Sequence, residues 1–100
     1  MDNASVTEER IQDCMKFAKN WNVILYNDDT TDFDFVVKVL KQVFKIDEKQ
    51  GVSLAFKTQS KGKTVIATYP KKLAQVRVKK AMDMAVNEGF NDFKVEAVEE

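Results

Sequence analysis

The sequence predicts an α+β domain: a three-stranded antiparallel sheet with three helices packed on one side, preceded by an N-terminal helix or tail. Short runs rich in β-branched and aromatic residues alternate with segments whose apolar residues recur at helical spacing. One hundred residues suffice for one hydrophobic core but not for two domains. The composition, 44% hydrophobic and 32% charged, is typical of a folded globular chain.

Three strands are expected, over residues 21–26, 64–69 and 93–98. The first reads Trp-Asn-Val-Ile-Leu-Tyr and stops at a cluster of turn-forming polar residues. The second is a β-branched run that Pro70 ends. The third alternates apolar with polar residues, which predicts a strand with one exposed face.

The N-terminal part of the chain is expected to form an extension over residues 1–20, ahead of a core domain over 21–100. Within it, residues 6–19 follow a capping box at Ser5 and place apolar residues at i, i+3, i+4 and i+7. An isolated helix of about 14 residues is marginal in water. The extension is therefore either a docked helix or a frayed tail.

Three core helices complete the prediction. The first begins at Thr30 or Thr31, since either hydroxyl can cap a helix start. The second begins at Asp47 and precedes a turn at 60–62, and the third runs from Pro70 to a left-handed cap at Gly89. The buried stripe of the first helix is predicted to be Phe33, Val36, Val37, Leu40 and Phe44, widened by Phe35, Val39 and Val43. Across the domain, the residues expected in the core are Val23, Leu25, Val37, Leu40, Phe44, Ile66, Leu73 and Ala81.

Several classes of function are disfavoured by the residues that the sequence lacks. There is no His, which removes Ser-His-Asp and Cys-His catalysis and His-ligated zinc. The single Cys14 cannot form an intrachain disulfide or a thiolate cluster. Asp28 and Asp29 are adjacent, so in an extended chain their carboxylates point apart and make no acid–base pair. We expect a protein that is not an enzyme and that uses no cofactor and no metal.

No apolar run approaches the length of a membrane span, and the first residues lack the basic start and apolar stretch of a signal peptide. A cytoplasmic chain that does not enter a membrane is expected. Its 16 basic and 16 acidic residues cancel, but the segment from Lys49 to Met82 holds nine basic residues and no acidic one. Such a segment is either a solvated helical face or a surface for nucleic acid or acidic protein. Its only aromatic residues are Phe56 and Tyr69, too few for a stacking platform, so nucleic acid is disfavoured.

The polar cluster Asn27-Asp28-Asp29-Thr30-Thr31 lies between the first strand and the next helix. Its simplest interpretation is a turn followed by a helix cap. The same carboxylates, amide and hydroxyls can instead hold a cationic or peptide-like ligand, because carboxylate and ammonium form strong charge-assisted hydrogen bonds. Spacing alone leaves both interpretations open.

The stretch from Val23 to Thr31, followed by Asp34-Phe35-Val36-Val37, resembles the opening of the ClpS family of adaptor proteins. The resemblance continues more weakly from there to the final strand. It implies a monomeric adaptor that docks on the N-terminal domain of a Clp-type AAA+ unfoldase. It also implies delivery of substrate proteins through a bulky hydrophobic N-terminal residue, called an N-degron.

The resemblance also implies a set of site residues. Asn27 and Asp28, with Asp29 in the same motif, would bind the α-ammonium of the substrate and its first peptide unit, assisted by Thr31. The family's pocket positions fall on Phe33, Val36, Ser53 and Phe56, with a wall near Phe93. The unfoldase would contact Lys71, Lys72 and Arg77.

The family completes its α-amino site with a His on the second central helix, and Lys57 takes the nearest matching position in this chain. An ammonium there would repel the ligand's own ammonium by about 1–4 kcal/mol at roughly 4 Å. The alternative function is therefore a ClpS-like regulator of the unfoldase that has lost N-degron recognition.

Overall fold

The structure is a computed structural model that describes residues 19–100. Its elements are β1 (Asn20–Tyr26), α2 (Phe33–Gln42), α3 (Glu48–Lys61), β2 (Lys63–Pro70), α4 (Lys71–Asn87) and β3 (Lys94–Glu99). The predicted α+β class is confirmed. The predicted helix over 6–19 lies, apart from its last residue, outside the described residues. Within residues 19–100, no helix is long and apolar enough to cross a membrane.

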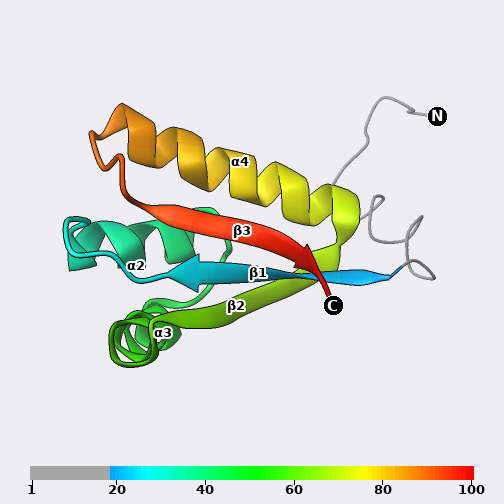
Figure 1. Cartoon of the computed structure of the whole chain (residues 1–100), viewed down its shortest axis with the longest axis horizontal. Coiled ribbons are helices and arrows are strands. Elements are labelled where there is room, and N and C mark those ends of the chain that lie inside the picture. Colours follow the sequence, from blue (N-terminus) through cyan, green and yellow to red (C-terminus); the bar gives the residue numbers. More distant parts are fainter. Residues whose placement is uncertain (1–18) are drawn as a thin grey trace.

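The sheet has the strand order β2-β1-β3, and both pairings are antiparallel. Figure 1 shows β1 between the other two strands, with α4 lying along β3. On β1 the side chains of Val23 and Leu25 are buried, whereas Asn22 and Ile24 on the opposite face are half-buried. Residues of α2 and α4 belong to the same buried cluster as Val23 and Leu25. The helices therefore cover one face of the sheet.

A bulge in β2 changes which of its residues face the core. Val23 pairs with Ala67 and Ile24 pairs with Val65, so Ile66 is an extra residue on β2. Because of the bulge, two consecutive residues contact the core: Ile66 is buried and Ala67 packs against the buried cluster. Val65 on the other face is 49% exposed.

The buried face of α2 differs from the predicted stripe. Its buried residues are Phe35, Val39 and Leu40. Phe33, Val36 and Val37, expected at the centre of the stripe, are only half-buried, so the prediction of a buried Val37 is wrong. The reason is that α2 packs on two elements, the sheet and α3, and the apolar side chains on its α3 side remain partly open. The other predicted core residues are buried: Val23, Leu25, Leu40, Phe44, Ile66, Leu73 and Ala81.

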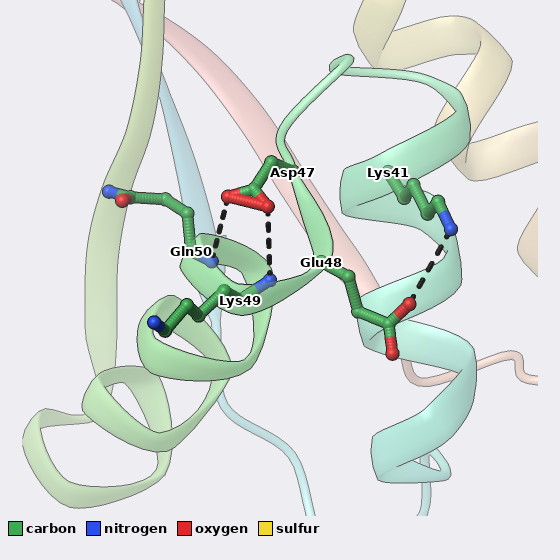
Figure 2. Close-up of polar contacts among 5 residues, drawn as sticks. All are labelled: Lys41, Asp47, Glu48, Lys49 and Gln50. Atoms are coloured by element: carbon green, nitrogen blue, oxygen red, sulfur yellow. Dashed lines mark hydrogen bonds and ion pairs between the residues drawn. The ribbon is translucent and has the colours of Figure 1, made fainter.

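The helix ends were predicted with mixed success. Asp47 caps α3 as expected, because its carboxylate accepts hydrogen bonds from the main-chain N–H groups of Lys49 and Gln50 (Figure 2). Helix α3 continues through the predicted turn to Lys61 and ends at Gly62, whose φ of 90° is left-handed. The N-cap of α2 is Asp32, so the predicted cap at Thr30 or Thr31 is wrong.

Candidate functional site

A small pocket of about 30 Å³ lies where the end of β1 and its following loop meet α2 and α3. Leu25, Ala55 and Thr58 are its buried residues, whereas Asn27 and Gln59 are exposed, which places them at its mouth. An apolar interior thus opens between polar groups. The complete lining is Leu25, Tyr26, Asn27, Asp28, Thr31, Phe33, Val36, Ala55, Thr58 and Gln59.

The carboxylate of Asp28 organises the loop at the mouth of the pocket. Its Oδ1 accepts the main-chain N–H of Thr30 at 2.9 Å and that of Thr31 at 2.7 Å. Its Oδ2 accepts the hydroxyl of Thr31 at 2.8 Å. The hydroxyl of Thr31 therefore donates within the loop, to Asp28, and does not cap α2.

The same contacts keep Asp28 charged. Partial burial alone would raise the pKa of the Asp28 carboxyl, but the hydrogen bonds from Thr31 and Thr30 outweigh it and hold this pKa below its usual value. Asp28 is therefore an anion throughout the neutral pH range. It is the one lining residue with a negative charge at neutral pH.

Two hydrogen bonds tie this loop to distant parts of the chain. The main-chain N–H of Asn27 donates to the carbonyl oxygen of Gly62 at 2.9 Å, which connects the loop to the end of α3. The Thr30 hydroxyl lies 2.8 Å from Oδ2 of Asp92 and 3.2 Å from Oδ1 of Asp28. It has one hydrogen, and the shorter distance favours donation to Asp92, in the turn before β3. The loop is thus fixed on two sides.

Tyr26 forms a further part of the lining. Its hydroxyl donates to Oε1 of Glu96 at 2.8 Å, and the Lys94 ammonium lies 4.8 Å from the centre of its ring. The hydrogen bond to Glu96, followed by burial and by the negative charge of Glu96, raises the pKa of the Tyr26 hydroxyl above its ordinary 10.0. Tyr26 is consequently neutral near the pocket at any physiological pH.

Phe33 and Phe56 form an aromatic pair beside the pocket, with ring centres 4.9 Å apart and planes tilted by 47°. Phe33 lines the pocket and is half-buried, whereas Phe56 is 59% exposed. A volume of about 30 Å³ accommodates one or two water molecules. An aromatic side chain can enter only if a lining side chain moves. Phe33 is the lining residue that contacts Phe56, which is exposed.

The predicted substrate-site residues divide into two groups. Asn27, Asp28, Thr31, Phe33 and Val36 line the pocket together. The other five do not line it: Asp29, Ser53 and Lys57 are exposed, Phe56 is exposed and pairs with Phe33, and Phe93 is 2% exposed in the core.

The three predicted residues of α3 outside the lining, Ser53, Phe56 and Lys57, are not on the buried side of this helix. The buried residues of this helix are Gly51, Ala55 and Thr58, spaced i, i+4 and i+7. Small residues at this spacing mark the side on which two helices approach closely. Ser53, Phe56 and Lys57 were assigned to the site from the family resemblance, and all three are exposed. The periodicity of the small residues was the signal that could have identified Ala55 and Thr58, and Gln59 follows Thr58 directly in the chain.

The predicted partner surface at the start of α4 also changes. Lys71 and Lys72 are exposed as expected. Arg77 is only 4% exposed, so its prediction as a surface charge is wrong. Its guanidinium donates to the carbonyl oxygen of Val43, at the end of α2, and lies 5.9 Å from the centre of the Tyr69 ring. Carbonyl groups at a helix end lack helical partners and favour a nearby cation, which explains why this charge is inside.

Comparison with known proteins identifies the family. Residues 16–96 match the family described as the ATP-dependent Clp protease adaptor protein ClpS. The chain belongs to the ClpS family. It is 33% identical over 90 residues to the ATP-dependent Clp protease adapter protein ClpS of Nautilia profundicola, covering 90% of this chain and 91% of that protein. It is 32% identical over 89 residues to ClpS 2 of Rhizobium meliloti, covering 89% and 88%.

A solved structure agrees with this assignment. The chain resembles Agrobacterium tumefaciens ClpS2 bound to L-phenylalaninamide with a TM-score of 0.78 and 30% identity, over 82% of this chain and 98% of that one. ClpS proteins are adaptors of ATP-dependent Clp protease and not enzymes. The predictions of the family and of a role without catalysis are therefore confirmed.

Proposed function

We propose that this ClpS protein binds the N-terminus of substrate proteins that begin with a large apolar residue and delivers them to Clp protease. The observation that carries the proposal is the pocket in which an ionised Asp28 stands beside an apolar interior. A free α-ammonium needs hydrogen-bond acceptors, and the first side chain needs a dry cavity. The pocket has acceptor groups beside an apolar interior, between one loop and two helices.

The acceptors of Asp28 leave room for such a ligand. An ionised carboxylate offers about four lone-pair positions, two on each oxygen. Oδ1 is occupied by the main-chain N–H groups of Thr30 and Thr31, whereas the only contact of Oδ2 within the described part of the chain is the hydroxyl of Thr31. Oδ2 therefore keeps an acceptor position for the ammonium. The carbonyl oxygen of the Asn27 side chain adds another at the mouth.

The chemistry of the ligand follows from the related structure. L-phenylalaninamide, bound by the A. tumefaciens protein, combines a free α-amino group with an aromatic side chain. A side chain of this size exceeds the volume of about 30 Å³ that the pocket has here. Binding is therefore expected to displace a lining side chain, and we expect this to be Phe33, whose neighbour Phe56 is 59% exposed.

The test of this proposal is a fluorescence titration with a short peptide that begins with Phe and has a free amino terminus. The acetylated peptide and the Asp28→Ala variant are each expected to weaken binding by about a hundredfold or more. Asp29→Ala is the matched control, because Asp29 lies in the same turn but outside the pocket lining. Equal binding of acetylated and free peptides would contradict the proposal and favour a regulator that recognises no N-degron.

We propose further that the unfoldase docks at the start of α4, on Lys71 and Lys72 with the half-exposed Val76 beside them. Charges at the rim of an interface mainly accelerate association. Lys72→Glu is therefore expected to slow association with the N-terminal domain of a Clp unfoldase and to reduce its salt dependence. Lys57→Glu on α3 makes the same change of charge elsewhere and is expected to leave that rate unchanged.

A further inference from the structure

Two polar side chains of the pocket come from α3, Thr58 and Gln59, and neither is the one that the family resemblance suggested. The Thr58 hydroxyl donates to the main-chain carbonyl oxygen of Leu54, which leaves Gln59 as the candidate for a ligand contact. Gln59 lines the pocket together with Asn27, Asp28 and Thr31. Lys57, two positions earlier, is exposed and absent from the lining. Two positions on a helix correspond to a rotation of about 200°, so these side chains leave α3 in nearly opposite directions.

We propose that Gln59 provides the α3 contact to the α-ammonium of the ligand, and that N-terminal recognition by this protein is therefore insensitive to pH between about 5.5 and 7.5. This inference rests on the proposed function, since it names a further residue of the same site. The carbonyl oxygen of a Gln side chain accepts a hydrogen bond from an ammonium at every pH. A His in this role accepts only while it is neutral, and its ordinary pKa of about 6.5 lies within this range.

The titratable residues around the pocket support an affinity that does not change between about pH 5.5 and 7.5. Of the lining residues, only Tyr26 and Asp28 are titratable; the pKa of Tyr26 is raised above 10.0 and that of Asp28 is lowered below 3.8. The chain contains no His. The charged side chains that contact the lining residues, or adjoin them in the chain, are Asp29, Asp32, Asp34, Lys57, Lys94 and Glu96, and Asp92 contacts the neighbouring Thr30. All are carboxylates or ammonium groups, and none is an imidazole.

The placement of Gln59 also removes the repulsion that Lys57 would have caused. Lys57 lies on the far side of α3, and no positive side chain belongs to the lining. The carboxamide of Gln59 is neutral and exposed, so placing it at the mouth of the pocket costs little solvation free energy. The site therefore retains three acceptor groups: the carboxylate of Asp28 and the side-chain carbonyls of Asn27 and Gln59.

The experiment measures the affinity of the free Phe peptide at pH 5.5, 6.5 and 7.5 for the wild-type protein and three variants. The wild-type affinity is expected to change less than twofold. Gln59→Met keeps the length of the side chain and removes its acceptor, with an expected loss of about tenfold to a hundredfold at every pH. Gln59→His is expected to bind about tenfold more weakly at pH 5.5 than at pH 7.5, as its imidazole becomes protonated. Lys57→Met is the control, and no change is expected.

The outcomes separate this inference from the function on which it rests. If the wild-type protein prefers the free peptide over the acetylated one but Gln59→Met binds as tightly as wild type, the role of Gln59 is refuted and the proposed function stands. A tenfold change of the wild-type affinity between pH 5.5 and 7.5 would likewise overturn the inference. If the wild-type protein does not distinguish the two peptides, the proposed function itself fails.

Discussion

Gly51 is a buried glycine in the first turns of α3, facing α2. Replacing it with Ala is expected to stabilise the protein. A Cβ built at this position would lie 3.7 Å from the Cβ of Leu40 and 3.7 Å from Cγ1 of Val37, which is ordinary van der Waals contact. The new methyl group therefore fills space between the two helices without displacing a neighbour.

The size of the effect follows from the helix. A glycine within a helix is about 0.5–1 kcal/mol less favourable than Ala, because it loses more backbone freedom on folding. Gly51→Ala should therefore raise the free energy of unfolding, measured by urea denaturation, by about 0.5–1 kcal/mol. A gain of 1 kcal/mol corresponds to a rise in Tm of roughly 4–8 °C for a domain of this length.

Gly62→Ala is the matched comparison, and its expected effect has the opposite sign. No atom lies within 4 Å of a Cβ at Gly62, but its φ of +90° is a conformation that residues with a side chain rarely adopt. A non-glycine residue in the left-handed region costs about 1–2 kcal/mol. If Gly51→Ala destabilises the protein, or if both variants change stability in the same direction, the packing described for α2 and α3 is incorrect.

Three further variants have defined outcomes. The difference in the free energy of unfolding between the wild-type protein and Asp28→Asn should be present above about pH 4 and should decline as the pH falls through the lowered pKa of Asp28. Unfolding measured at pH 3–6 follows this difference, and a constant value would contradict the prediction. Phe56→Ala should strengthen peptide binding about twofold to tenfold, because an aromatic pair of about 0.5–1.5 kcal/mol no longer holds Phe33, whereas weaker binding would mean that Phe56 contacts the ligand. Arg77→Met should lower the free energy of unfolding by about 1–3 kcal/mol, since the Val43 carbonyl loses its donor, and an unchanged urea midpoint would exclude this role.

The sequence predicted the elements of the core better than their faces. Strand propensity located β1 and β2 to within one or two residues, since both runs are rich in β-branched residues and bounded by turn formers. The bulge at Ile66 could not be predicted, because the register of a strand depends on its partner. The burial of Val37 was predicted wrongly for a similar reason, because the exposure of this side chain depends on where α3 packs against α2.

Within the candidate site, the loop residues were easier to predict than those of α3. Asn27, Asp28 and Thr31 are close in sequence, so the chain itself brings them to one place. Gln59 reaches them only through the packing of α3 on α2, where Gly51 faces Leu40 and Val37. The residues of α3 that the family resemblance assigned to the site, Ser53, Phe56 and Lys57, lie outside the lining.

The strand order leaves β2 and β3 as the two edges of the sheet. Free edges are templates for pairing with another chain, and proteins protect them with charge, proline and bulges. Here β3 carries Lys94, Glu96 and Glu99 within six residues, and β2 ends at Pro70 and contains the bulge at Ile66. Both edges therefore resist continuation of the sheet into a neighbouring molecule. This protection disfavours aggregation of the adaptor through pairing of its edge strands with those of another chain.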